Sequence, residues 1–423
     1  MTDVVVVGGG IAGLAAALSA TAEGARVTVL DARPGATSLA GGAWDFGLPP
    51  TRSDRALRET RSSAELLGAL ARAHPTHPLA PHATELAALA ATSHDAVLGA
   101  LAIYAPLALD RPPALVSTDT GLVRSVATAQ RAVLDLGALP TGRIAVATFP
   151  AARAHDGAFV AASLGELSAA TGDARRFCAV EVEILRRGRD VWLHPHEAGA
   201  LFDDDRARDR LVRALGRALG GQSFDAVLLP PLLGEHDDTA WSRVRAALAM
   251  PIGEWASSLA GPQSARLVRA LARSFARSKA SYERSPVVRA SESAIETERT
   301  THRAGAVVLA AGRHLAGGLV FRRESEIEPL FGLPGYLDGA PLSSSDTSAL
   351  FDGDERAGFR VGVGVDDAMR PLDASGKPKS ATLFAAGSIL SGVPIAGEGG
   401  GLGIAALTGW IAGRNAARAA ARA

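Results

Sequence analysis

Residues 4–14 decide the fold, and they read Val4-Val5-Val6-Val7-Gly8-Gly9-Gly10-Ile11-Ala12-Gly13-Leu14. Four β-branched residues in a row predict a buried parallel strand. The glycines at 8, 10 and 13 then follow in the spacing G-x-G-x-x-G. Residues 15–22 predict a helix, and residues 26–30 predict a second strand that ends at Asp31. This order, within about 30 residues, is typical of a dinucleotide-binding βαβ unit.

Each part of this unit has a physical role in holding a nucleotide. Gly8 permits a tight turn, Gly10 lets the backbone approach a pyrophosphate, and Gly13 lets the helix pack closely on the strand. The start of the helix offers free N–H groups and the positive end of the helix dipole. Asp31 is placed to accept hydrogen bonds from an adenosine ribose. The cofactor contacts predicted here are Gly8, Gly10, Ile11, Ala12, Gly13, Asp31, Ala32 and Arg33.

The place of this fingerprint in the sequence favours FAD over NAD as the ligand, by analogy with flavoprotein oxidoreductases. A loop of small residues follows, in which Ser38, Gly41 and Gly42 would let a bulky flavin approach the backbone. No histidine lies in that loop, so we do not expect a flavin linked covalently through histidine. FMN is kept as the alternative cofactor.

Two later segments predict that the chain returns to the same site. Residues 305–313 and residues 382–388 each read as a buried strand that ends in small residues. A glycine-dense turn then leads into a predicted helix over residues 404–421. The dipole of that helix would stabilise negative charge on a reduced flavin. The contacts predicted here are Ala311, Gly312, Gly387, Ser388, Gly399, Gly400, Gly401 and Leu402.

The order of the elements predicts an α/β protein: a Rossmann-like FAD/NAD(P)-binding flavoprotein fold with an inserted second α/β domain. We expect residues 1–60 plus 300–423 to form a discontinuous flavin-binding domain, and residues 61–299 to form the inserted substrate or cap domain. Residues 55–135 read as mostly helical. A small sheet, expected to cover the flavin, is predicted from strands at 143–149, 179–185 and 224–231.

The sequence shows no readable set of nucleophile, base and acid. Three residues are candidates for catalytic groups near the flavin ring: His314, Arg370 and Glu398. An arginine in that place would suit an anionic substrate or a reduced flavin, although structural pairing with a neighbouring carboxylate is the default interpretation. The histidines at 74, 77 and 82 lie among prolines without carboxylates at metal-ligand spacing, so we expect no metal site.

Composition excludes several classes of function. The 44 Lys+Arg residues balance 44 Asp+Glu residues, which argues against a partner that is a nucleic acid. The one cysteine, Cys178, excludes an intrachain disulfide and an iron–sulfur cluster held by this chain's own thiolates. No apolar stretch reaches the ~18–20 residues of a membrane span. We therefore expect a cytoplasmic protein, or one peripheral to the cytoplasmic face of the inner membrane through partner subunits.

One helix predicted over residues 262–282 has a basic face. Arg266, Arg269, Arg273 and Arg277 follow helical spacing along it. A solvated face or a subunit interface is the ordinary interpretation, and a docking surface for a partner is the alternative.

The motifs together resemble one family, the B subunits of the anaerobic glycerol-3-phosphate dehydrogenase complex. The glycine fingerprint is generic to flavoproteins, whereas the ordered set from residue 305 onward is specific. The segments that carry the resemblance are residues 8–14, 37–42, 121–125, 159–164, 228–230, 308–312, 317–320, 328–333, 362–371, 383–390 and 394–396.

The resemblance implies a flavoprotein oxidoreductase subunit that oxidises sn-glycerol 3-phosphate to dihydroxyacetone phosphate and passes electrons toward quinone. It implies two partners, a second flavoprotein subunit and an iron–sulfur membrane-anchor subunit. The family is usually described as using FMN in this subunit. Asp31 stands where a ligand of the FAD ribose belongs, so we favour FAD here.

Two other functions fit the same residues. The first is a stand-alone FAD-dependent oxidoreductase of another small substrate. The second is a flavin-binding electron-relay or scaffold subunit that turns over no substrate, which the missing acid–base pair keeps open.

Overall fold

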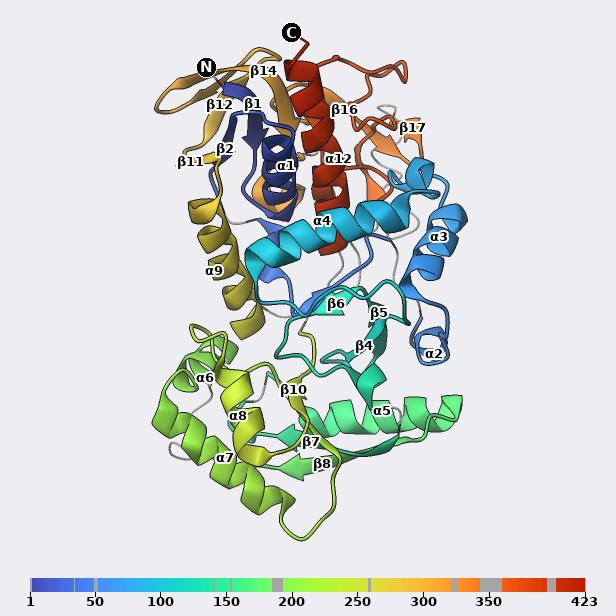
Figure 1. Cartoon of the computed structure of the whole chain (residues 1–423), viewed down its shortest axis with the longest axis vertical. Coiled ribbons are helices and arrows are strands. Elements are labelled where there is room, and N and C mark those ends of the chain that lie inside the picture. Colours follow the sequence, from blue (N-terminus) through green and yellow to red (C-terminus); the bar gives the residue numbers. More distant parts are fainter. Residues whose placement is uncertain are drawn as a thin grey trace.

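The computed structural model describes residues 2–33, 35–48, 52–139, 141–152, 154–184, 193–257, 260–320, 326–342, 360–393 and 401–422. The described chain has two α/β units at opposite ends of an elongated molecule, with short β hairpins between them (Figure 1). Both chain ends lie at the same end of the molecule as the first unit.

A seven-stranded sheet forms the centre of the first unit. Its parallel part contains the predicted strands, and its residues Val4, Val5 and Val6 are fully buried. β-branched side chains that are covered on both faces favour such a strand over a helix. The parallel strands are β11 (Ser281–Arg284), β2 (Val27–Asp31), β1 (Thr2–Val7), β14 (Thr301–Leu309) and β19 (Leu383–Ala385). The antiparallel ones are β13 (Ala294–Thr297) and β12 (Val287–Ala290).

Two helices from opposite ends of the sequence pack side by side on this sheet. They are α1 (Ile11–Ala22) and α12 (Leu402–Ala420), and α4 (Leu86–Leu101) crosses both of them (Figure 1). Most residues of α1 and α12 are buried, which explains the small side chains in both. The predicted return of the chain to the first βαβ unit is therefore confirmed as part of the Rossmann-like α/β fold.

The pairing of strands extends this unit beyond the predicted segments. Strands β11, β12 and β13 join the first sheet although they precede residue 300. The returning segment thus begins upstream of the predicted boundary, because β11 adds to the free edge of β2. The division of the chain into domains at 60 and 300 stays a prediction.

The predicted helical character of residues 55–135 is wrong for its last part. Helices α2 (Ser53–Ala56), α3 (Ser63–Ala73) and α4 end by residue 101. Two antiparallel pairs involve the rest of this stretch, and the valines of one of them lie in cross-strand pairs, while the abundant alanine only mimics a helical composition. They join β4 (Ala114–Ser117) to β5 (Val123–Val126), and β3 (Ala43–Trp44) to β6 (Thr128–Ala129).

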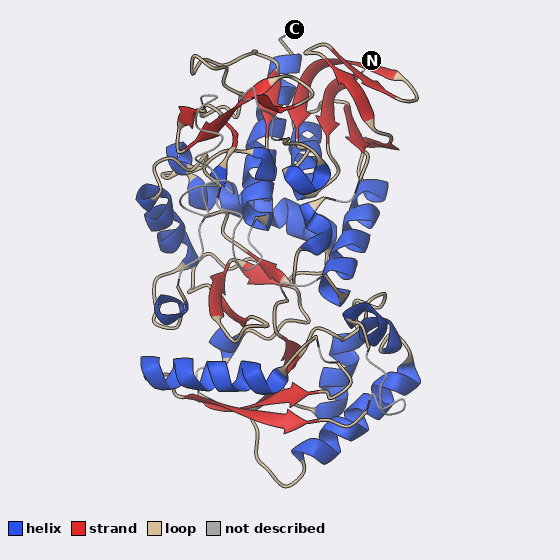
Figure 2. Cartoon of the chain, turned by 180° about the vertical axis from the view of Figure 1, so that it is seen from behind, coloured by secondary structure: helices blue, strands red, loops and turns tan. Residues whose placement is uncertain are grey.

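A parallel four-stranded sheet forms the second α/β unit. Its strand order is β10 (Ile252–Glu254), β9 (Ala226–Leu229), β7 (Gly142–Thr148) and β8 (Arg175–Glu181). Its helices are α5 (Gly157–Thr171), α6 (Pro195–Leu201), α7 (Asp205–Leu219) and α8 (Ala240–Leu248). Cys178 lies half-buried on the edge strand β8. Figure 2 shows this sheet at the far end of the molecule from the first one.

A third, small antiparallel sheet lies beside the first unit. It contains β15 (Glu326–Glu328), β16 (Leu333–Leu337), β17 (Ala340–Pro341) and β18 (Gly362–Val363). The buried Glu328 side chain accepts hydrogen bonds from the backbone N–H groups of Leu330 (2.9 Å) and Phe331 (2.7 Å). These bonds shape the turn that connects β15 to β16.

Helix α9 (Pro262–Arg277) joins the two units, and three of its arginines contact side chains of this chain. Arg266 is buried and pairs with the fully buried Glu254 of β10 at 2.5 Å. Arg269 donates to His236, and Arg273 pairs with Asp238 at 2.9 Å. Arg266 is buried and cannot contact a partner, whereas Arg269 and Arg273 are half-buried and Arg277 is exposed, so a docking surface at these three residues stays a prediction.

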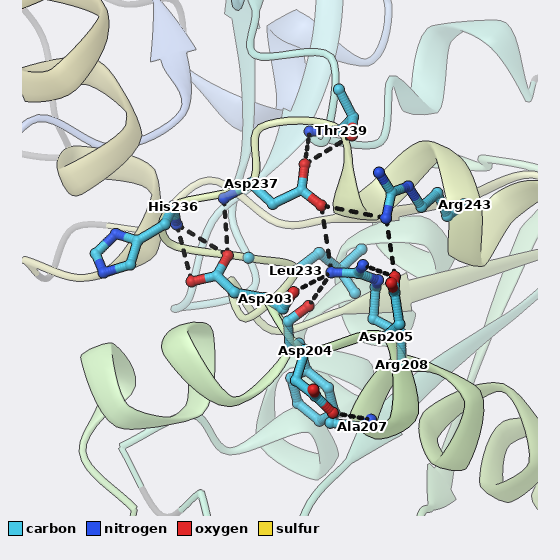
Figure 3. A network of polar contacts seen from close by, with 12 residues as sticks. Asp203, Asp204, Asp205, Ala207, Arg208, Leu233, His236, Asp237, Thr239 and Arg243 are labelled. Carbon is cyan, nitrogen blue, oxygen red and sulfur yellow. Dashed lines mark hydrogen bonds and ion pairs between the residues drawn. The ribbon is translucent and has the colours of Figure 1, made fainter.

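Residues 236–238, which Arg269 and Arg273 contact, are linked to the start of α7 by a network of ion pairs and hydrogen bonds (Figure 3). Asp237 pairs with Arg208 of α7 at 3.3 Å, and the carboxylate of Asp203 accepts the N–H groups of His236 and Asp237. Arg208 is itself buried and also pairs with Asp205. Breaking a buried ion pair is costly because it leaves one charge without a partner in the interior. The contacts of α9 and of this network therefore hold the loop in place between the units.

Candidate functional site: a nucleotide cavity at the strand ends

A cavity of about 550 Å³ lies at the carboxyl ends of β1, β2 and β14. This is where open parallel sheets bind their ligands. The starts of α1 and α12 also line it, so segments from both ends of the sequence form one site. The predicted residues that line it are Gly8, Gly10, Ile11, Ala12, Asp31, Ala32, Arg33, Ala311, Gly312, Ser388, Gly401 and Leu402.

The glycines of the fingerprint are required by close backbone contacts. Gly8 has a φ of +115°, and a Cβ there would lie 2.2 Å from the carbonyl oxygen of Ala310. A Cβ at Gly13 would lie 1.9 Å from the carbonyl oxygen of Gly8, so Gly13 serves packing and does not line the cavity. A side chain at either position would push α1 away from the sheet.

The start of α1 provides the features of an anion site. Gly10 is the residue before the helix and offers no side chain to cap its N–H groups. The first turn of the helix contains no acidic residue, and Gly10, Ile11 and Ala12 face the cavity. Thr37 lies beside them, 3.4 Å from the Ile11 nitrogen. The positive end of the helix dipole therefore points to the cavity, which suits a pyrophosphate.

Asp31 lies where the sequence predicts the ribose ligand, and it already has two partners. One carboxylate oxygen accepts the N–H of Gly9 at 3.3 Å, and the other accepts the hydroxyl of Tyr282 at 2.6 Å. Burial raises the pKa of Tyr282, and its bond to Asp31 adds to that effect. The Tyr282 ring stacks on Phe275 with 4.8 Å between ring centroids. The Tyr282 hydroxyl thus holds the Asp31 carboxylate in place at the wall of the cavity.

Several predicted cofactor contacts lie away from the cavity. Ser38 donates its hydroxyl to the carbonyl of Gly35, and Gly387 donates its N–H to Thr408 at 2.9 Å. Gly42 donates to the side chain of Gln263 at 2.8 Å, and a Cβ at Gly41 would lie 2.0 Å from the carbonyl of Ser257. The small residues at 41 and 42 therefore allow close contact with α9 and the chain before it.

The candidate catalytic residues do not meet at the cavity. His314 is exposed, and its Nδ1 bonds to the carbonyl of Leu319 at 3.2 Å. Arg370 pairs with Asp366 at 2.6 Å, as the default interpretation of the sequence expects. Neither residue lines the cavity. Glu398, Gly399 and Gly400 lie outside the described residues.

Sequence reasoning missed one whole wall of the cavity. Ser285, Pro286 and Val287 line it from the turn between β11 and β12, and Pro329 and Leu330 line it from the small third sheet. Residues 285–287 carry no motif, and the pairing of β11 with β2 brings them to the site.

Sequence reasoning also missed Arg313, which connects two segments beside the cavity. Its guanidinium donates to the carbonyls of Ser388 (2.8 Å) and Leu390 (2.9 Å). Burial lowers the pKa of Arg313 to about 10. The arginine therefore ties the end of β14 to the turn after β19, both of which face the cavity.

The expectation that the second sheet covers the flavin is wrong. Within the described part of the chain, no residue between 41 and 284 lines the cavity. The sheet lies at the far end of the molecule because α9 and the hairpins separate it from the nucleotide site (Figures 1 and 2).

The described residues offer neither a cluster of metal ligands nor a membrane-spanning helix. They contain no group of three or more His, Cys, Asp or Glu side chains placed to hold a metal ion. None of the helices described is both long and apolar enough to cross a bilayer.

The fold and the cavity define a dinucleotide-binding flavoprotein class, in which glycine-lined backbone, a free helix start and a terminal acid hold the cofactor. The FAD dependent oxidoreductase family matches residues 3–236, more than half of the chain, and the chain belongs to that family. FAD is accordingly its cofactor, as the sequence predicts, and the chain is a flavoprotein oxidoreductase.

Curated relatives carry the name predicted by resemblance. In two strains of Halobacterium salinarum, proteins named as the probable B subunit of anaerobic glycerol-3-phosphate dehydrogenase are 33% identical over 227 residues, which is 50% of this chain and 51% of the relatives. The resemblance to that family is confirmed. The chain matches about half the length of these relatives.

Solved structures align with this chain at low similarity. A 3-ketosteroid Δ1-dehydrogenase from Sterolibacterium denitrificans is 13% identical and covers all of both chains at a TM-score of 0.41. Glycine oxidase from Geobacillus kaustophilus is 16% identical and covers 99% of this chain and 95% of its own, at a TM-score of 0.32. We draw no argument on substrate from these structures.

Proposed function

We propose that this chain is the flavoprotein B subunit of an anaerobic-type glycerol-3-phosphate dehydrogenase complex. The complex oxidises sn-glycerol 3-phosphate to dihydroxyacetone phosphate and passes the electrons toward quinone. The observation that carries the proposal is the nucleotide cavity, in a chain whose 33%-identical relatives bear that subunit's name.

The residues of the cavity fit FAD. The start of α1 would hold the pyrophosphate, Asp31 would accept the ribose hydroxyls, and the backbone at 310–312 and 401–402 would line the remainder. FAD supplies the two-electron acceptor that oxidation of an alcohol to a ketone needs. The protein's part is to bind and orient the cofactor and to exclude water from it.

The proposal includes two partner subunits, a second flavoprotein and an iron–sulfur membrane anchor. With Cys178 as its one thiol, this chain cannot hold a thiolate-ligated cluster of its own. Its electrons must therefore pass to another chain or to a diffusible acceptor. We place the chain in the cytoplasm or at the cytoplasmic face of the inner membrane, held there by these partners.

A second function is favoured by one specific observation. Among the described residues that line the cavity, the ionisable side chains are Asp31 and Arg33, and both lie at the end of β2. The described lining thus places no acid or base near α12. A subunit that relays electrons through its flavin and oxidises no substrate itself fits this arrangement.

Anaerobic titration of the purified, FAD-loaded chain separates these functions. If the chain oxidises substrate, sn-glycerol 3-phosphate should bleach the visible flavin band without any partner, whereas glycerol at equal concentration should not. Bleaching that needs the second flavoprotein subunit would instead support the relay function. A flavin that dithionite reduces but glycerol 3-phosphate never does, with or without partners, would contradict both.

A further inference from the structure

The N-terminal end of α12, which faces the cavity, is capped by the carboxylate of an aspartate. Gly401, Leu402, Ile404 and Ala405 line the cavity at the start of this helix. The carboxylate of Asp45 accepts the N–H groups of Gly401 at 2.8 Å and of Gly403 at 3.1 Å through one oxygen. Residue 45 thus caps a helix whose preceding residue, Gly401, lies 356 residues later in the sequence.

The contact between Asp45 and the helix is built into the backbone. Gly401, the residue before α12, has a φ of +119° and no side chain to form a cap of its own. A Cβ at Gly403 would lie 2.2 Å from the carbonyl oxygen of Asp45. Position 403 therefore requires glycine so that the first turn can lie directly against Asp45.

The surroundings of Asp45 supply hydrogen-bond donors. Its second carboxylate oxygen accepts the N–H of Gly47 at 2.6 Å, so three backbone N–H groups hold the side chain. The side chain is 6% exposed, and the ion pairs found among the described residues include none with it. Such a set of donors suits an ionised carboxylate, which only accepts hydrogen bonds.

Buried aromatic rings pack around Trp44, the residue before Asp45. The rings of His94 and Tyr104 pack edge-on against Trp44, at 5.7 Å and 5.2 Å between centroids, and all three residues are buried. Burial lowers the pKa of His94 to about 4, so it adds no positive charge at neutral pH. Charge at a buried site is poorly screened, so the Asp45 carboxylate acts on the start of α12 at nearly full strength.

We propose that Asp45 is a positioning residue that cancels the positive end of α12 and so disfavours negative charge on the bound flavin. This inference rests on the proposed binding of FAD. The start of α1, with no acid in its first turn, keeps its positive end for the pyrophosphate, whereas the start of α12 does not. The helix start that the sequence predicts as a stabiliser of reduced flavin therefore loses its positive character.

Sulfite provides a test that does not depend on turnover. Sulfite adds to N5 of oxidised flavin through its sulfur lone pair, and the electron pair displaced from the ring leaves negative charge at N1 and C2=O. No other reagent is needed. A neutral cap at residue 45 should therefore strengthen the adduct. For Asp45→Asn we expect a sulfite dissociation constant about tenfold lower than in the parent chain, which corresponds to ~1.4 kcal/mol.

Two further variants control for structural damage. Asp45→Ser keeps a capping oxygen and removes the charge, since Asp, Asn and Ser cap helices about equally well. It should lower the dissociation constant in the same direction as Asp45→Asn. Asp204→Asn is the matched control, because Asp204 caps α7 in the second unit through a 2.9 Å bond to Ala207. It should leave sulfite binding unchanged.

Each outcome bears on the inference. An unchanged dissociation constant in FAD-loaded Asp45→Asn and Asp45→Ser would overturn it, and so would an equal change in Asp204→Asn. A parent chain that binds no FAD would overturn both this inference and the proposed function. A parent chain that binds FAD and sulfite but is never reduced by glycerol 3-phosphate would overturn the proposed function alone.

Discussion

Asp31 and Asp45 lie only 14 residues apart in sequence, yet they serve different parts of the site. Asp31 stands at the cavity wall, is partly exposed, and is held by one amide and the Tyr282 hydroxyl. Asp45 lies behind the wall, is buried, and is held by three amides. The first acid is available to a ligand, whereas the second has its hydrogen-bonding capacity used within the fold. Their surroundings thus assign one to recognition and the other to structure and electrostatics.

The largest difference between the two acids should appear in stability. Asp45→Ala leaves the buried N–H groups of Gly47 and Gly403 and the part-buried N–H of Gly401 without an acceptor, so we expect a loss of about 2–4 kcal/mol in the free energy of unfolding. Asp31→Ala should cost less than about 1 kcal/mol, because water can replace its partners. Urea denaturation of both variants without cofactor measures this difference. Equal losses would contradict the contrast between them.

Cofactor affinity should show the opposite order. Asp31→Ala removes a charged acceptor for the ribose, so we expect FAD to bind about 10- to 100-fold more weakly. FMN has no adenosine ribose, and its affinity should change by less than about twofold. Quenching of flavin fluorescence on binding gives both constants. If FAD affinity were unchanged in Asp31→Ala, the ribose assignment would be wrong.

Acid sensitivity should belong to the Asp45 region. Burial lowers the pKa of His94 from 6.5 to about 4, so the unfolded chain binds a proton there at a higher pH than the folded chain does. The contribution of neutral His94 to the free energy of unfolding is therefore complete above pH 6.5. It falls as the pH drops toward 4, by up to ~1.4 kcal/mol per pH unit. In His94→Leu this part of the slope should disappear. Parallel stability curves for variant and parent would refute the assignment.

The smallest effect should come from Tyr282. Tyr282→Phe keeps the ring on Phe275 and removes only the hydroxyl that holds Asp31, so FAD affinity should fall about two- to fivefold. In the Asp31→Ala background the same change should have no further effect. Two independent, additive losses in this double-mutant cycle would show that Tyr282 does not act through Asp31.

The parts of this protein that could be predicted from sequence are those set by local patterns. The run Val4–Val7, the spacing of Gly8, Gly10 and Gly13, and the acid after the second strand are neighbours in sequence, and their geometry follows from backbone sterics. The return strands at 305–313 and 382–388 and the last helix could also be predicted from local patterns of apolar and small residues.

The parts that could not be predicted depend on distant pairings. Tyr282 meets Asp31 across 251 residues, and Asp45 meets Gly401 across 356. The arginines of α9 look like a solvated face until β10 brings the buried Glu254 against Arg266. No periodicity in α9 marks which of its arginines has a buried partner, because that partner comes from another element.

The position of Cys178 allows the distance between the two α/β units to be followed by energy transfer. The thiol lies half-buried on the edge strand of the second unit, and the flavin site lies in the first. One maleimide dye on Cys178 would therefore form a donor–acceptor pair with the flavin without any engineered residue. Energy transfer between them would report whether the α9 joint keeps its geometry when substrate or a protein partner binds.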